Sequence, residues 1–465
     1  MMTRRLFQFL ASGLSISHLS KSLASPKVLT PWQISTFKVD VTCPIGHPCM
    51  GGGISNAKVV VDPLECRGVV IKNGDLKKPV VIASIDWCEI RNEAYDQFRD
   101  ALAKAANTTR DHVILTAIHQ HDTPIADLFA EELLVKNGGI GSICMPDFFQ
   151  KTIEKVASAT KQSEMQFQNL THIGTGQAQV KGVASNRRFM LPDGKPSFSR
   201  TSATRDEYAR SQPEGTIDPY LKTLTFWNQE KPVAAFSFYS VHPMSYYGQG
   251  EVSWDFPGMA REARQKATPD CLQVYVSGCS GNVTAGKYND GSRANRQTLA
   301  NRLESAMKEA FETTKRVPLK TSVLRDVKVR IEPRTSVGFS REELTDKLKN
   351  DPKPFHKCLA AMGLSWLRRE ENPNHIVDVP CLDFGFAALL LMPGESYVEF
   401  QLYAQSIRPE DFICVAGYGE SATGYVPTDK AVQENDTNLG DWCWVAPDSE
   451  SRLKLAIRAA LGSMI

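Results

Sequence analysis

Short runs of consecutive apolar residues alternate along the chain with longer segments in which apolar residues recur every three or four positions. The short runs indicate buried strands, and the longer spacing indicates amphipathic helices. Residues 80–86 and 112–118 are predicted strands, and residues 90–106 between them are a predicted helix. Alternation of this kind predicts an α/β protein rather than a helical bundle or a β-sandwich.

The pattern continues through most of the chain. Residues 221–227 and 233–241 flank a polar turn and predict a hairpin. Residues 350–378 are rich in proline, asparagine and charge, and are predicted to form an excursion on the surface. The other predicted elements are a helix beginning near Asp255, a strand over 272–276, a helix over 293–314, a β-like segment over 319–331, a short helix opened by a capping box at Ser340, strands over 379–384 and 386–392, a helix ending near Ser406, a strand over 412–416 and a terminal helix over 449–461.

Composition narrows the class of protein. The 465 residues are 42% hydrophobic and 23% charged, which is ordinary for a globular protein. No internal repeat or low-complexity linker is visible, so one large domain is expected over residues 33–465, built from mixed β-sheets packed with helices in a layered α/β sandwich. The 54 Lys and Arg residues nearly balance 52 Asp and Glu residues. Such a balance argues against nucleic acid as a partner.

The first residues predict export. A paired arginine at Arg4 and Arg5 is followed by a modestly apolar stretch and by the small residues Ser22 and Ala24. Residues 1–24 therefore indicate a twin-arginine export signal, although a basic, frayed terminus is the alternative. No later stretch approaches the roughly 18 to 20 apolar residues of a spanning helix. A periplasmic or extracellular protein without a transmembrane segment is expected.

Eleven cysteines are scattered singly, and none belongs to a Cys-x-x-Cys zinc motif. Cys271, Cys381 and Cys414 lie within apolar runs and are predicted to be small buried hydrophobes. Because substrates of twin-arginine export generally fold before they are exported, few disulfides are expected.

The densest group of possible metal ligands is Thr116-Ala117-Ile118-His119-Gln120-His121-Asp122-Thr123-Pro124, which follows a predicted strand. In an extended chain alternate residues face the same side, so His119 and His121 are placed to converge. Imidazole is a common zinc ligand. Two surface or hydrogen-bonded histidines explain the motif equally well.

Three further candidates also follow predicted strands: His242 in Val-His-Pro, Glu395 in Pro-Gly-Glu, and Tyr425 in Gly-Tyr-Val. Each has a structural explanation by itself, as a histidine at a strand end, a charge at a helix start, or a packing aromatic. Strand ends share one rim of a sheet, which is where α/β proteins build their sites. Together the candidates therefore indicate a metal site.

These segments resemble those of the neutral/alkaline ceramidases and their bacterial relatives, from about Phe37 to about Thr428. The family has Thr-His-Thr-His-Ser-Gly-Pro at the His119 segment, His-Pro at His242, Gly-Asp where this chain has Trp254-Asp255, Pro-Gly-Glu at Glu395, and Gly-Tyr-Val-Thr-Thr at Tyr425. The resemblance implies the fold of the ceramidase catalytic domain. Because the chain ends at Ile465, the immunoglobulin-like domain of a characterised ceramidase is expected to be missing.

Carried over to this chain, the family's roles imply that zinc (Zn²⁺) binds His119, His242, Glu395 and Tyr425. His121 would lie close by, free for hydrogen bonding or proton transfer. The implied reaction is hydrolysis of an N-acyl amide bond, in a ceramide-like lipid or a related amide, by a metal-activated water.

Other residues are assigned less directly. In Asn186-Arg187-Arg188, either Arg187 or Arg188 is expected to reach the site, where it would stabilise an oxyanion or bind a carboxylate. Asp255 is expected either to orient His242 or His121, or only to cap a helix.

The loop over residues 278–286 departs from the family. Thr284 stands where the ceramidases have an essential serine, and Asn282 stands where they have an aspartate. The added methyl group of Thr284 crowds a substrate. Two alternatives to amide hydrolysis therefore stay open: a zinc hydrolase of a different ester or amide, and a non-catalytic binding protein of the same fold.

Overall fold

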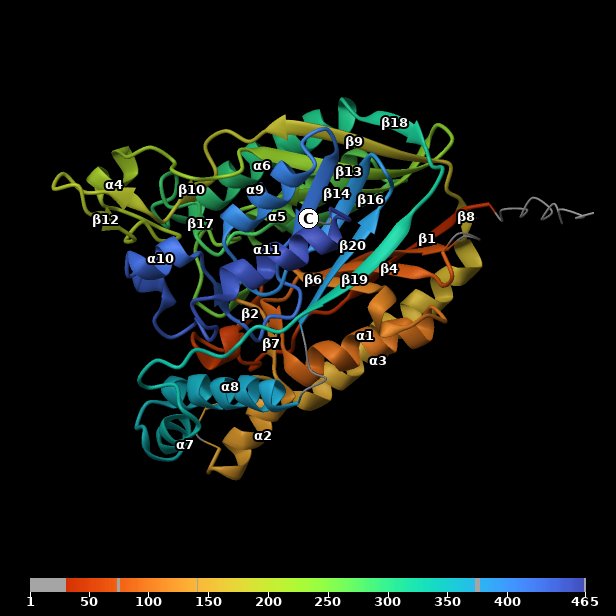
Figure 1. Cartoon of the computed structure of the whole chain (residues 1–465). Coiled ribbons are helices and arrows are strands. Elements are labelled where there is room, and N and C mark those ends of the chain that lie inside the picture. Colours follow the sequence, from red (N-terminus) through yellow and green to blue (C-terminus); the bar gives the residue numbers. More distant parts are fainter. Residues whose placement is uncertain (1–30, 73–75, 140, 373–376, 464–465) are drawn as a thin grey trace, which may run out of the picture.

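The computed structural model describes residues 31–72, 76–139, 141–372 and 377–463. The predicted export signal, residues 1–24, lies outside these ranges. Within them, three sheets of four or five strands form the body of the protein, and helices lie around the outside of the sheets (Figure 1). The prediction of mixed sheets packed with helices is confirmed.

The first sheet carries the amino-terminal part of the chain. Its strands, in order across the sheet, are β6 (Val113–Ala117), β4 (Val80–Ile85), β3 (Glu65–Lys72), β1 (Gln33–Asp40) and the short β8 (Gln168–Asn169). Neighbours are antiparallel except β4 and β6, which are parallel. Helix α1 (Asn92–Ala105) connects these two strands, and α3 (Pro146–Ser163) follows the sheet and packs against α1.

The second sheet has the same plan. Its strands, in order, are β16 (Leu272–Ser277), β14 (Lys231–Tyr239), β13 (Tyr220–Asn228), β9 (His172–Gln179) and the short β18 (Lys315–Pro318). The parallel pair is β14 and β16, connected by α5 (Asp255–Ala267). Helix α6 (Arg293–Glu312) follows β16 and packs against α5.

The third sheet repeats the plan again. Its strands, in order, are β23 (Phe412–Ala416), β21 (Ala387–Leu391), β20 (Val377–Asp383) and β19 (Val323–Val329). The parallel pair is β21 and β23, connected by α9 (Val398–Ile407). Helix α11 (Ser449–Ala460) follows and packs against α9.

Three units of identical connectivity therefore make up the body of the protein. Each has three antiparallel strands, a crossover helix, a fourth strand parallel to the third, and a covering helix. The ends of the three fourth strands are bonded to one another: the Ala117 amide donates to the Tyr418 carbonyl, and the Gly417 amide donates to the Ser277 carbonyl. The carboxyl ends of strands from all three sheets thus meet at one place.

The hydrophobic core follows from the two faces of each sheet. Side chains from all three sheets, among them Ile82, Phe236 and Leu389, pack together in one central cluster. The neighbouring residues on the same strands face the opposite side of the sheet and pack against helices. Val81 lies in one cluster with Leu102 of α1, and Leu390 lies in another cluster with residues of α11. This alternation is the period-two pattern of strands buried on both faces.

One sequence prediction is wrong. Residues 350–378 were expected to form a surface excursion, but Pro354–Glu371 is a helix, α8, which packs against α2 (Leu128–Lys136) and α7 (Arg341–Asn350). Its prolines precede or open the helix, where the missing amide is tolerated, and Trp366 on its inner face is fully buried. The capping box of α7 at Ser340 is present as predicted.

Short elements complete the description. They are β2 (Val59–Val60), β5 (Glu89–Ile90), β7 (Ile125–Ala126), β10 (Ser185–Asn186), β11 (Phe189–Met190), β12 (Pro196–Ser197), α4 (Glu207–Ser211), β15 (Glu251–Val252), β17 (Val283–Thr284), β22 (Glu395–Ser396), β24 (Tyr425–Val426) and α10 (Asp429–Gln433). All eleven cysteines are buried free thiols, as expected for Cys271, Cys381 and Cys414. Among the helices of the described ranges, none is long and apolar enough to cross a bilayer.

A buried carboxyl group makes the stability of this fold depend on pH. Glu420 accepts the amides of Asn92 and Ala422 at 3.0 and 2.8 Å, and Arg369 Nη1 lies 3.0 Å from its other oxygen. Burial nevertheless raises the pKa of Glu420 to about 7. A glutamate in the unfolded chain has a pKa of about 4.3. Because the folded pKa is higher, the stability that protonated Glu420 contributes is fully present below the unfolded pKa and is lost as pH rises through the folded pKa.

We therefore expect the free energy of unfolding to fall between about pH 5 and about pH 8 by roughly 3 kcal/mol from this group alone. Glutamine resembles the protonated acid, so Glu420→Gln should flatten that decline. Urea unfolding of the wild type and the variant at about pH 5 and about pH 8 measures how far the free energy of unfolding falls in each protein. An equal fall in both proteins would show that Glu420 does not cause the pH dependence.

Candidate metal centre

His119 lies two residues beyond β6, in a strained backbone conformation. Its φ of +68° is in the left-handed region, which costs a non-glycine residue roughly 1–3 kcal/mol and is found mainly at functional sites. The buried ring points Nδ1 at the Cys88 carbonyl, 3.2 Å away, and Nε2 at Glu395 Oε2, also 3.2 Å away. The strained backbone of His119 thus coincides with a ring whose two nitrogens face the Cys88 carbonyl and Glu395.

His242 follows β14 and is completely buried. Its Nδ1 donates to the Ser280 carbonyl at 2.7 Å, so the neutral ring carries its proton there. Nε2 is left as an acceptor and lies 2.9 Å from Glu395 Oε2. The loop after β16 therefore fixes the tautomer that a metal ligand needs.

Glu395 and Tyr425 come from the third sheet unit. They are register partners in the parallel pair formed by β22 and β24, so their side chains lie next to each other. The Tyr425 hydroxyl accepts a hydrogen bond of 2.8 Å from Arg187 Nη1. Burial raises the pKa of Tyr425. Burial also acts to raise the pKa of Glu395, but the neighbouring His119 and His242 outweigh it and hold that pKa well below its usual value.

The donor set fits a divalent cation. Burial and the charge of Arg187 lower the pKa of His242 to about 4, so its ring is neutral at pH 7. Its Nε2 lone pair then faces the ionised Glu395 oxygen, and two acceptors at 2.9 Å attract a cation rather than each other. One nitrogen each from His119 and His242 and one oxygen of Glu395 all lie within 4.8 Å of one another. Imidazole and carboxylate are zinc ligands, and Tyr425 offers an oxygen beside them.

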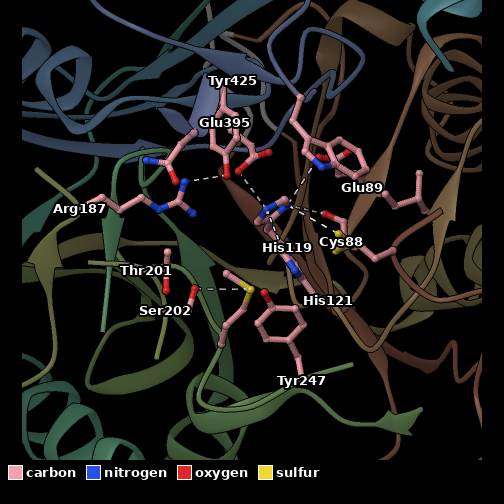
Figure 2. A pocket seen from close by; sticks show the side chains of 15 residues that line it. Cys88, Glu89, His119, His121, Arg187, Thr201, Ser202, Tyr247, Glu395 and Tyr425 are labelled. Atoms are coloured by element: carbon pink, nitrogen blue, oxygen red, sulfur yellow. Dashed lines mark hydrogen bonds and ion pairs between the residues drawn. The ribbon is translucent and has the colours of Figure 1, made fainter. Parts of the chain in front are cut away.

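Three of these side chains, those of His119, Glu395 and Tyr425, line a cavity of about 230 Å³ (Figure 2). Its other walls are mixed: Met50, Ile125, Met244 and Trp442 are apolar, whereas Thr201 and Ser202 present hydroxyl groups. Figure 2 shows Arg187 and Tyr425 on one side of the cavity and Cys88 and Glu89 on the other, with the histidines between them.

His121 also lines the cavity, and its ring nitrogen lies within 4.8 Å of ligand atoms of His119 and Cys88, a second possible ligand group that shares His119 with the first. Its Nε2 is 3.3 Å from His119 Nε2, and its ring packs edge-on against Tyr247. Burial, together with the neighbouring His119 and His242, lowers the pKa of His121 well below its usual value. The ring is therefore neutral at pH 7.

The structure distinguishes the two adjacent arginines. Arg187 is buried in the cavity wall, where Nη1 donates to Tyr425 and Nη2 lies 3.4 Å from His242 Nε2. Arg188 turns the other way and binds Glu434 through Nε and Nη2 at 2.5 and 2.7 Å. Only Arg187 is in reach of a molecule bound in the cavity.

Two other predicted residues are not brought to the cavity. The fully buried Thr284 hydroxyl donates to the Thr201 carbonyl at 3.1 Å and accepts the Gly286 amide at 3.2 Å. Asp255 accepts the Ser245 hydroxyl at 2.9 Å and pairs with Arg296 at 3.1 Å, without contacting His242 or His121. Both therefore stabilise loops around the site.

Asn282, the other departure in this loop, has a structural contact of its own. It accepts the first amide of α9, that of Val398, at 3.0 Å, and donates to Glu399 at 2.9 Å. Asn282 thus ties the loop after β16 to the helix that follows Glu395.

Sequence reasoning missed three residues that contact His119. Cys88 supplies the carbonyl already described, and Glu89 Oε1 lies 3.7 Å from His119 Nδ1 while its other oxygen binds Arg91. Tyr418 stacks on the His119 ring, with 4.3 Å between centroids. Cys88 and Glu89 follow the apolar run of β4, and Tyr418 follows that of β23, so their positions after strands were the available signal.

Comparison with known proteins gives a fold-level result. No family model and no curated protein matches the sequence. Neutral ceramidase from Pseudomonas aeruginosa is similar over 94% of this chain and 75% of that chain, with a TM-score of 0.67 and 16% identity. A structure described as ceramidase complexed with C2 is similar over 93% of this chain and 76% of that chain, with a TM-score of 0.66 and 15% identity. The chain therefore has the fold of the neutral ceramidases, which is the family that its motifs resemble.

Proposed function

We propose that the protein is a zinc-dependent hydrolase that cleaves N-acyl amide bonds. The observation that carries the proposal is the convergence of His119, His242 and Glu395, each from a different sheet unit, beside a cavity that His119 and Glu395 line. The similar solved proteins are described as ceramidases, so a ceramide-like amide is the first substrate class to consider.

His119, His242 and Glu395 would hold the metal, with Tyr425 as a fourth ligand. Bound zinc supplies a Lewis acid that polarises a carbonyl oxygen and activates a water molecule. The protein residues orient the ligands: the Cys88 and Ser280 carbonyls each accept a hydrogen bond from an Nδ1, which leaves both Nε2 atoms directed inward.

Arg187 is the group that would stabilise negative charge on the carbonyl oxygen. It is a cation buried in the cavity wall, and burial strengthens its interaction with a developing oxyanion. Thr284 already donates to a backbone carbonyl, so Arg187 rather than the threonine would take this role.

His121 would transfer the protons. Its neutral ring lies beside His119 and lines the cavity, so it is placed to accept a proton from the attacking water and to return it to the departing amine. Its Nδ1 is buried and has no hydrogen-bond partner among the described residues.

The size of the cavity predicts a preference for short acyl groups. A volume of about 230 Å³ lies below the roughly 300–1,000 Å³ that is typical of pockets for small molecules. The scissile amide occupies part of that space, so only a short acyl chain fits inside. We expect kcat/KM to fall at least about tenfold between butanoyl and hexadecanoyl amides of the same amine, a loss of about 1.4 kcal/mol.

A chain-length series with one chromogenic amine measures this preference. Rates that rise with acyl length would show that the chain is bound outside the described cavity, while leaving amide hydrolysis itself intact.

Turnover on a panel of acyl amides and matched esters tests the proposed function. Zinc-dependent amide hydrolysis that disappears in His119→Ala is the expected result. Hydrolysis of the esters alone would favour a zinc hydrolase that acts on ester bonds. Zinc binding without turnover of any panel member would favour a binding protein, and absence of zinc binding would refute the metal centre.

A further inference from the structure

Tyr418 lies where the three sheet units meet. It follows β23 by two residues, and its backbone bonds two of the metal-binding segments. Its amide donates to the carbonyl of Gly394, the residue before Glu395, at 3.1 Å. Its carbonyl accepts the amide of Ala117, two residues before His119, at 3.1 Å. The backbone of one residue thus links the segments that carry two proposed ligands.

The side chain of Tyr418 contacts the ring of His119 directly and reaches His242 through Ser280. Its ring lies nearly parallel to that of His119, with a centroid distance of 4.3 Å and an angle of 15°. Its hydroxyl and Ser280 Oγ are 2.6 Å apart, and the carbonyl of that same serine accepts a hydrogen bond from His242 Nδ1 at 2.7 Å. The Tyr418 ring therefore contacts the imidazole of His119, and the Tyr418 hydroxyl is linked through Ser280 to the imidazole of His242.

The backbone conformation at residues 417 and 418 allows the ends of the three sheets to approach closely enough for these contacts. Tyr418 has a φ of +55°, a strained value for a non-glycine residue, and its side chain is almost completely buried. The preceding Gly417 donates to Ser277 and accepts the Thr116 hydroxyl at 2.6 Å. A side chain at position 417 would begin only 2.8 Å from the Gly278 carbonyl, so glycine is needed for the strand ends to touch.

The geometry points to Tyr418 as the positioning residue of the metal centre: its ring sets the plane of His119, and its hydroxyl, through Ser280, sets the direction of His242. The inference rests on the proposed metal function. Groups that orient metal ligands through hydrogen bonds typically change metal affinity by about 10- to 100-fold when they are removed. Tyr418 should act in this way without touching metal or substrate.

Tyr418→Phe tests the hydroxyl alone, because it keeps the ring, the backbone and the volume. We expect zinc affinity, measured by competition with a chelator, to fall by about 10-fold or more. The matched control is Tyr95→Phe, which removes another buried tyrosine hydroxyl, bonded to the Leu115 carbonyl at 2.8 Å and away from the cavity. The control should bind zinc as the wild type does.

Ser280→Ala breaks the same hydrogen bond from the other side and keeps the carbonyl that accepts from His242. It should lower zinc affinity by a similar factor, and the double variant Tyr418→Phe with Ser280→Ala should lose little more than either single variant. Cobalt substituted for zinc gives a second readout, since its absorption spectrum reports ligand geometry. That spectrum should change in Tyr418→Phe and Ser280→Ala but not in Tyr95→Phe.

Unchanged zinc affinity and an unchanged cobalt spectrum in Ser280→Ala would overturn the inference, even if Tyr418→Phe fails to fold. Equal losses of affinity in Tyr418→Phe and Tyr95→Phe would also overturn it, because the effect would then be general destabilisation. Either result leaves the proposed function in place if the wild type binds zinc and hydrolyses amides. A wild-type protein that binds no zinc would end both.

Discussion

Glu395→Gln is expected to release zinc and to lower kcat/KM for amide hydrolysis by at least about a thousandfold, which corresponds to about 4 kcal/mol of transition-state stabilisation. The substitution keeps the size of the side chain but removes its charge. One oxygen of Glu395 faces both His119 at 3.2 Å and His242 at 2.9 Å, so it is the anion toward which both imidazoles are directed. Metal analysis of the purified protein and steady-state kinetics measure the two losses.

Glu399→Gln is the matched control for this substitution. Glu399 is four residues along the chain, on α9, and its carboxylate accepts from Asn282 at 2.9 Å outside the cavity. The control variant should keep its zinc and its activity within about twofold, since it changes no proposed ligand. Full zinc occupancy in Glu395→Gln would show that the three converging side chains are not the metal site.

Arg187→Met should lower kcat by about 100- to 1,000-fold when it is measured at saturating zinc. This range is the cost of removing one donor that stabilises a developing oxyanion, about 2.7–4 kcal/mol. Methionine retains most of the side-chain volume, and the Tyr425 hydroxyl loses its 2.8 Å donor. A fall in kcat and kcat/KM by the same factor is expected because the interaction is made in the transition state.

The neighbouring arginine gives this experiment its control. Arg188→Met removes a cation one residue away that binds Glu434 on the other side of the segment. Its kinetics should stay within about twofold of the wild type, since this half-buried ion pair lies outside the cavity. If both arginine variants lose activity equally, Arg187 has no special part in catalysis.

Periodicity in the sequence was sufficient for most of the fold. The strands β4, β6 and β16 begin and end within a residue or two of their predicted bounds, because they are short apolar runs buried on both faces. Helix α8 was missed since the prolines and charges at its ends outweighed the buried residues of its inner face. The threefold plan was invisible because it lies in connectivity, which different side chains satisfy equally well.

The candidate site was predictable only in part. His119, His242, Glu395 and Tyr425 follow strands, and the structure brings the first three together as the sequence predicted. Which of Arg187 and Arg188 faces inward depends on where the two-residue β10 pairs with β17, which no local pattern records. The contacts of Tyr418 depend on a backbone turn of positive φ at a residue type that rarely adopts it.

The threefold plan of the fold has a consequence for how metal and stability are coupled. Each unit contributes one of the three converging side chains: His119 from the first, His242 from the second and Glu395 from the third. An ion held by all of them cross-links the molecule noncovalently, so its binding free energy is shared by every unit rather than by one loop. Detachment of any single unit would destroy the coordination sphere, and saturation with metal would oppose each such detachment alike.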